Sequence, residues 1–239
     1  MTTDCIQPAR QPARNAADSF RNPTAIANYA EGPPRFVPGF EALHRMTAVL
    51  LAENAPATAR VLVLGAGGGL ELGALARAQP DWSFVGVDPS QPMLDLASGT
   101  LGPLMQRIEL VHGYIDDAPA GPFNAATCLL TLHFLDAAER LRTTRAIRSR
   151  LKPGSPFVAA HGSFPQDPAS RPRWLSRYAA YAVGSGADPA QAASARAAVD
   201  AHLNLLDPVD DEGILRDAGF SDIAMFYAAF TWRGWVARA

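Results

Sequence analysis

Short apolar runs alternate along the chain with longer segments in which apolar and polar residues mix. The run ARVLVLG at 59–65 is continuous and ends at a glycine, which is typical of a parallel strand covered on both faces. Similar runs occupy 82–88, 108–113, 123–132 and 155–161. Helices are predicted between them, at 70–80, 91–101 and 136–151. This repetition predicts an α/β fold with a doubly wound parallel sheet, whose ligands bind at the rim formed by the carboxyl ends of the strands.

The first 57 residues differ from this pattern. Residues 1–20 mix Pro, Arg, Gln and Ala without periodicity, which predicts a disordered tail. Residues 21–57 are predicted to form an N-terminal helical cap, in which a helix begins at Asn22, GPPRFVPGF at 32–40 breaks it, and a second helix follows over 40–55. The apolar face of the second helix is predicted from residues three and four apart, namely Phe40, Leu43, Met46, Val49 and Leu50.

Residues 58–239 are predicted to form the main domain. Between about 165 and 207 the alternation lapses into two helical stretches, which we interpret as an insertion over the rim of the sheet. A helix at 211–220 is followed by two apolar strands, at 222–230 and 231–239, with little between them. We expect these strands to form an antiparallel hairpin at the sheet edge. The expected architecture is a seven-stranded, mostly parallel sheet with a helical insertion before its last two strands.

Composition and charge narrow the classes of function. Hydrophobic residues make up 48% and charged residues 18% of the 239, which is the balance of a globular protein. The net charge of −2 supplies no general attraction to nucleic acid or to an acidic membrane, and no apolar run approaches the ~18 residues of a membrane helix. Cys5 and Cys128 form neither a disulfide framework nor a metal-ligand pair. A cytoplasmic protein without a metal site is expected.

The most informative segment is VLVLGAGGGLEL, a strand that runs through a glycine-rich turn into a helix. Glycines there let the backbone approach a bound cofactor closely. The dinucleotide fingerprint G-x-G-x-x-G is not met, because Leu70 stands where a small residue is needed, and NAD or FAD is therefore disfavoured. The compact G-x-G-x-G at Gly65, Gly67 and Gly69 instead resembles the first motif of the class I S-adenosylmethionine (SAM)-dependent methyltransferases, with Val63 in place of the family's usual acid.

Later segments resemble the same family in the same order. Asp88 closes the second strand, where the resemblance implies a carboxylate that accepts both ribose hydroxyls; the alternative for an acid at this place is a helix N-cap. PMLDLA at 92–97 and HGYIDDAP at 112–119 resemble the segments that flank the adenine. The implied cofactor contacts are Gly65, Ala66, Gly67, Gly69, Asp88, Pro89, Met93, Tyr114, Ile115, Asp116, Leu129, Arg35 and Phe40. For Arg35, a solvated side chain is the alternative.

A narrower likeness is to the carboxy-S-adenosylmethionine synthases, which convert SAM with prephenate into a carboxylated SAM used in tRNA wobble-uridine modification. It lies in FVPGFEALHRM, in TLHFLDAAER and in the terminal DAGFSDIAMFYAAFTWRGWVA. Three positions differ from that family: Phe40 where it has Tyr, Tyr114 where it has Asp, and Leu129 where it has Asn. A carboxylate-binding arginine is implied near Arg196. Because three polar cofactor contacts are changed, ordinary methyl transfer is the preferred interpretation.

Candidates for the acceptor side come from the rim and the insertion. Methyl transfer from a sulfonium needs orientation and exclusion of water, and it needs a general base only where the acceptor must lose a proton. His133, which ends the fourth predicted strand, and His161, which ends the fifth, are the candidate bases; a hydrogen-bonded structural histidine is the alternative for His133. The candidate acceptor contacts are Trp174, Tyr178, Tyr181 and Arg196, with helix packing as the alternative for the aromatic residues.

The sequence therefore predicts a SAM-dependent methyltransferase that acts on a small-molecule acceptor and leaves S-adenosylhomocysteine (SAH) as product. Two alternatives stay open. One is an enzyme similar to the carboxy-SAM synthases. The other is a non-catalytic SAM-binding protein, in keeping with the changes at Val63 and Tyr114. RNA as a partner and a homodimer are also left open.

Overall fold

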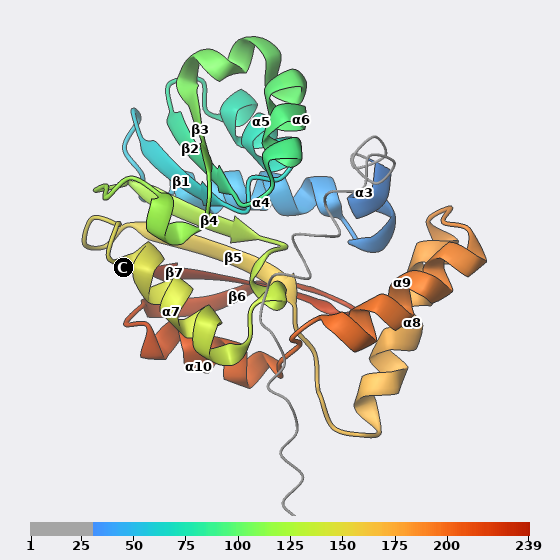
Figure 1. Cartoon of the computed structure of the whole chain (residues 1–239). Helices are drawn as coiled ribbons and strands as arrows, with labels where there is room; N and C mark the ends of the chain where they lie inside the picture. The colour runs from blue at the N-terminus through green and yellow to red at the C-terminus, as the bar shows by residue number, and fades with distance from the viewer. Residues whose placement is uncertain (1–30) are drawn as a thin grey trace, which may run out of the picture.

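The structure of the protein, a computed structural model, describes residues 31–239 (Figure 1). The tail expected at 1–20 and the helix expected to begin at Asn22 lie outside the described residues. In the described part, one sheet of seven strands has the order β3-β2-β1-β4-β5-β7-β6, which confirms the predicted sheet. The strands are β1 Arg60–Leu64, β2 Ser83–Asp88, β3 Ile108–His112, β4 Ala125–Leu129, β5 Pro156–Gly162, β6 Ser221–Ala229 and β7 Trp232–Arg238.

The sheet is parallel from β3 across to β5 and antiparallel at one edge. β1 pairs in parallel with β2 and β4, β2 pairs with β3, and β4 pairs with β5. β7 runs antiparallel to β5 and β6 runs antiparallel to β7, so the last two strands form the expected hairpin. The strand order reverses between β1 and β4. In open α/β sheets, a crevice for ligands forms at such a switch, beyond the carboxyl ends of the strands.

Helices cover both faces of the sheet (Figure 1). They are α3 Gly32–Phe36, α4 Phe40–Ala52, α5 Leu70–Ala78, α6 Gln91–Leu101, α7 Ala137–Arg148, α8 Ser170–Gly184, α9 Pro189–His202 and α10 Pro208–Asp217. Alternate residues of β1 face the two layers, because side chains of a strand point to opposite faces. Val61 and Val63 share a core with residues of α4, α5 and α6, whereas Leu62 and Leu64 share one with residues of α7 and α10.

The N-terminal part differs from the prediction in two ways. The segment predicted to break a helix contains the short helix α3, because proline fits the first turn of a helix. The predicted apolar face of α4 is wrong at Val49, which is 62% exposed, whereas the polar His44 and Thr47 are buried. α4 packs on both α5 and β5, and this docking decides which of its faces is buried.

The predicted helical insertion consists of α8 and α9, which pack on each other, and α8 also packs on α3. Tyr178 of α8 lies at this junction, with its ring centroid 5.3 Å from that of Phe36 and 6.5 Å from that of Trp232. The insertion is thereby attached to the N-terminal segment and to β7. In the part of the chain that the structure describes, no helix is both long and apolar enough to cross a membrane.

Candidate cofactor site

A cavity of about 200 Å³ lies at the rim of the sheet, over the ends of β1, β2 and β4. The turn after β1 contributes to it, together with the loops after β2, β3 and β4 and parts of α4, α5 and α7. The predicted cofactor contacts that line it are Phe40, Gly65, Ala66, Gly67, Asp88, Pro89, Met93, Tyr114, Ile115 and Leu129. The cavity thus lies at the switch in strand order and gathers most of the predicted contacts.

The glycine turn brings the backbone to the wall of this cavity. Gly65 and Gly67 have φ angles of 82° and 49°, a left-handed conformation that residues with a Cβ rarely adopt. A Cβ on Gly65 would also lie 2.0 Å from Oγ1 of Thr131. The N–H of Gly65 donates to the carbonyl of Val87 at 2.8 Å, which ties the turn to β2. Gly69, also a predicted contact, precedes α5 and does not line the cavity.

Asp88 faces the glycine turn from the end of β2. Its carboxylate oxygens accept hydrogen bonds of 2.9 Å from the N–H groups of Gly67 and Ser90. Burial raises the pKa of this carboxyl, and the two N–H donors oppose that shift. The N-cap position of α6 is occupied by Ser90, so Asp88 is not the cap. Because a carboxylate oxygen accepts more than one hydrogen bond, Asp88 still has acceptor capacity for a diol in the cavity.

Four titratable side chains that line the cavity are missed by the sequence analysis, namely His44, Glu71, Glu139 and Arg142. Arg142 pairs with Glu139 and Asp116 at the surface, whereas Glu71 and His44 are buried. Glu71, in the first turn of α5, is 6% exposed, and burial raises the pKa of its carboxyl to about 8 against an opposing effect of Thr127. His44 of α4 is 7% exposed, and its ring centroid lies 4.5 Å from that of Phe40. Burial lowers the pKa of His44 to about 4, so the imidazole is neutral at pH 7. The sequence signals were slight: Glu71 closely follows the glycine turn, and His44 lies one helical turn from Phe40.

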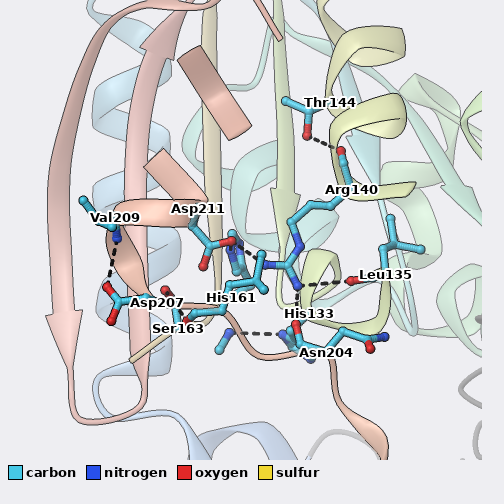
Figure 2. A network of polar contacts seen from close by, with 12 residues as sticks. His133, Leu135, Arg140, Thr144, His161, Ser163, Asn204, Asp207, Val209 and Asp211 are labelled. Carbon is cyan, nitrogen blue, oxygen red and sulfur yellow. Dashed lines mark hydrogen bonds and ion pairs between the residues drawn. The ribbon is translucent and has the colours of Figure 1, made fainter. Parts of the chain in front are cut away.

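The candidate bases His133 and His161 do not line this cavity. Both are 3% exposed and belong to a buried polar network with Arg140 and Asp211 (Figure 2). Nδ1 of His133 accepts the N–H of Gly162 at 3.1 Å. Nε2 of His161 lies 3.1 Å from Oδ1 of Asp211. Burial lowers the pKa of His133 well below its ordinary value, so this ring is a neutral part of the interior.

Arg140 holds the network together. Its guanidinium pairs with Asp211 and donates to the carbonyls of Leu135 and Asn204 (Figure 2). The Asn204 side chain donates in turn to the carbonyl of Phe134 at 3.0 Å. The network therefore joins the loop after β4 to the segment that follows α9. Both histidines contact this junction: His133 accepts the N–H of Gly162, and His161 lies beside Asp211. These partners are distant from the histidines in the sequence.

The predicted acceptor contacts of the insertion also lie outside the cavity. Tyr178 packs at the junction with α3 and β7. The Arg233 guanidinium lies 5.3 Å from the ring centroid of Trp174, and Tyr181 packs against the turn between β6 and β7. Arg196 is exposed on α9. Trp174, Tyr178 and Tyr181 thus occupy packing positions, which was the alternative interpretation of these aromatic residues.

Arg35 and Asp116, two of the predicted cofactor contacts, are engaged at the surface. Arg35 pairs with Glu31 at 3.0 Å, and Asp116 pairs with Arg142 at 2.9 Å. Neither lines the cavity. The carboxylate of Asp116 accepts a hydrogen bond from Arg142 of α7, about 25 residues further along the chain. Such a partner is not visible in the local sequence.

Residues 61–154 match the family model described as a methyltransferase domain. The matched segment contains the glycine turn, Asp88 and the loops after β3 and β4, so the match coincides with most of the cavity. The matched segment covers about two fifths of the chain and is similar to a methyltransferase domain. The seven-stranded, mostly parallel sheet matches the class I methyltransferase fold that the first resemblance implied. The narrower likeness to carboxy-SAM synthases gains no support.

Several solved structures share the fold of this chain at low identity. An O-methyltransferase family protein from Burkholderia thailandensis has a TM-score of 0.62 at 17% identity, over 92% of this chain and 61% of that one. The structure of PigF with SAH has a TM-score of 0.63 at 18% identity, over 96% of this chain and 62% of that one. The [4+2]-cyclase SpnF has a TM-score of 0.64 at 19% identity, over 91% of this chain and 76% of that one. The chain thus spans about three fifths of the first two proteins, and the likeness establishes the fold alone. No curated protein sequence matches the chain.

The chemistry of the cavity fits SAM. Asp88, oriented by two N–H donors, suits a ribose diol, and the side chains of Met93 and Ile115 offer apolar surface to a base. The left-handed turn at Gly65 and Gly67 brings the backbone to the wall of the cavity. Glu71 has a buried carboxyl oxygen without a hydrogen-bond partner, which suits a cationic group. SAM carries a diol, a base and a cationic amino-acid end.

Proposed function

We propose that the protein transfers a methyl group from SAM to a small-molecule acceptor at this cavity. The observation that carries the proposal is the coincidence of the methyltransferase match with a cavity built on Gly65, Gly67 and Asp88. SAM, when bound, supplies a methyl group that the sulfonium charge already activates. The task of the protein is therefore to bind the cofactor, orient the acceptor and exclude water.

The order of the strands suggests how the cofactor would be held. Ile115 follows β3, Asp88 ends β2, and Gly65 follows β1, and these three strands are neighbours in that order. With the ribose hydroxyls on Asp88, the base would lie between Met93 and Ile115. The methionine end would then lie over Gly65, on the side of α4 and α5.

His44 is the side chain that we propose as proton acceptor, in place of His133 and His161. It lines the cavity from α4, the side on which the methionine end would lie. Its imidazole is neutral at pH 7, because burial lowers its pKa to about 4. A neutral imidazole takes up the proton that an acceptor hydroxyl loses when it is methylated, provided that the two groups are within hydrogen-bond reach.

A small molecule with a hydroxyl group is the acceptor class that the cavity favours. Its wall is mostly apolar, with a few polar groups, which is the usual character of a small-molecule site. The net charge of −2 supplies no general attraction for RNA phosphates. One protein of similar fold is described as an O-methyltransferase family protein, which supports the choice of hydroxyl acceptors.

Cofactor binding is tested first, by calorimetry with SAM and SAH. Asp88→Ala is expected to weaken binding about 10- to 100-fold, because buried ribose hydroxyls lose a charged acceptor. The matched control is Asp95→Ala, which changes an exposed carboxylate of α6. Failure of the wild-type protein to bind SAM or SAH would refute the proposal.

Turnover is tested next, with a panel of small phenols, alcohols, amines and carboxylates. Mass spectrometry should show a methylated product formed together with SAH. Cofactor binding without product across the panel would favour a non-catalytic SAM-binding protein. The ligand that copurifies with the protein also separates SAM from carboxy-SAM, because the two differ in mass by one carboxylate.

A further inference from the structure

We propose that Glu71 receives the ammonium group of the methionine end of SAM and so makes the protein specific for the intact cofactor. The inference rests on the proposed function, since it assigns a role to one residue of the same cavity. Neither the glycine motif nor the segments that resemble other methyltransferases assign Glu71 a role.

Glu71 is a buried carboxyl with few partners in the protein. Its residue is 6% exposed, it lines the cavity, and its Oε1 atom is shielded from solvent without a hydrogen-bond partner. Of the ion pairs formed among residues 31–239, none includes Glu71. An unpaired buried carboxyl destabilises a protein when it is charged. A cationic ligand group would supply the missing partner.

The position of Glu71 selects the end of the cofactor that it can meet. The Thr127 hydroxyl of β4 acts on its carboxyl, and Thr127 is in register with Val63 of β1. Glu71 therefore lies on the β4 side of β1, whereas Asp88 ends β2 on the other side. A cofactor with its ribose on Asp88 and its base toward β3 directs its methionine end to Glu71. That end carries the ammonium group, and the base end carries no cation.

Among the described residues, no side-chain cation pairs with Glu71. Arg142 lines the same cavity, but its guanidinium pairs with Asp116 at 2.9 Å and with Glu139 at 3.1 Å. His44, on α4, is neutral at pH 7 because burial lowers its pKa to about 4. Asp88 is a carboxyl itself. Cys128, on β4, has a thiol whose pKa is raised by burial and then by the charge of Glu71. Arg140 acts on Cys128, but its guanidinium is engaged with Asp211.

The environment of Glu71 also predicts a proton change on binding. Burial raises the pKa of its carboxyl to about 8, so the group is protonated at pH 7 in the free protein. An ammonium partner favours the ionised carboxylate and lowers that pKa. Binding of SAH at pH 7 is therefore expected to release close to one proton, and this release should depend on Glu71.

Calorimetry with two ligands tests the assignment. SAH keeps the ammonium group, whereas 5′-methylthioadenosine keeps the adenosine and the thioether but lacks the amino-acid end. Each is titrated into the wild-type protein, Glu71→Gln and Glu109→Gln, at pH 7 in two buffers of different ionisation enthalpy. Glu109 is an exposed carboxylate of β3 outside the cavity and serves as the matched control.

We expect Glu71→Gln to weaken SAH binding about 10- to 100-fold, to abolish the proton release, and to leave methylthioadenosine binding unchanged. Unchanged methylthioadenosine binding also shows that the variant is folded. Equal losses for both ligands, or no loss for either, would overturn the assignment of Glu71 while the proposed function stands. A wild-type protein that binds neither ligand would overturn the proposed function and this inference together.

Discussion

Replacement of Glu71 with Gln is expected to change how the stability of the ligand-free protein depends on pH. The carboxyl has an ordinary pKa of 4.5, and burial raises it to about 8 in the folded protein. The folded state thus binds the proton more tightly, and the stability from this group is fully present below pH 4.5 and is lost as the pH rises to about 8. At about 1.4 kcal/mol for each pKa unit between the two states, the loss is about 3 kcal/mol at pH 7 and about 5 kcal/mol above pH 8.

Urea denaturation followed by circular dichroism measures this effect between about pH 5 and pH 8. The informative quantity is the difference in unfolding free energy between Glu71→Gln and wild type, because His44 and the other titrating groups are common to both proteins. Gln has no proton to lose, so the difference should grow in favour of the variant by about 3–4 kcal/mol over this range. Glu109→Gln, at an exposed position, should show no such trend. A difference that stays constant from pH 5 to pH 8 would refute the burial that we assign to Glu71.

Three further substitutions test other parts of the structure. Gly65→Ala places a Cβ 2.0 Å from Oγ1 of Thr131 at a φ of 82°. Calorimetry should therefore find SAH binding lost, and stability should fall by about 1–3 kcal/mol. Normal SAH binding would contradict the role that we assign to the glycine turn. Arg140→Met leaves the buried Asp211 carboxylate with His161 but without its arginine partner and should cost about 3–5 kcal/mol in urea denaturation; an unchanged midpoint would mean that the Arg140–Asp211 pair adds nothing. His44→Gln should lower turnover about 10²–10⁴-fold with an acceptor that must lose a proton; full turnover would remove its role as base.

The order of elements from 58 to 239 follows from local patterns in the sequence. A buried parallel strand needs a continuous apolar run, and a helix needs a start signal and a breaker, so each is visible within about ten residues. The glycine turn is likewise local, because the positive φ angles at Gly65 and Gly67 depend on the residue at that position. The position of Asp88 at a strand end follows from the same alternation.

Which side chains reach the cavity was decided by tertiary packing. α4 packs on α5 and β5, and His44 of α4 lines the cavity. Glu71, in the first turn of α5, is buried at the same cavity. His161 lies near the end of β5 as predicted, whereas His133 lies beyond the end of β4, in a short 3-10 turn. Both are held in an interior network with Arg140 and Asp211. Asp211 lies 50 residues beyond His161 in the chain, and no local pattern specifies such a pairing. Side-chain direction at a strand end depends on the partners that the whole fold supplies, and those partners exist only once distant segments have packed together.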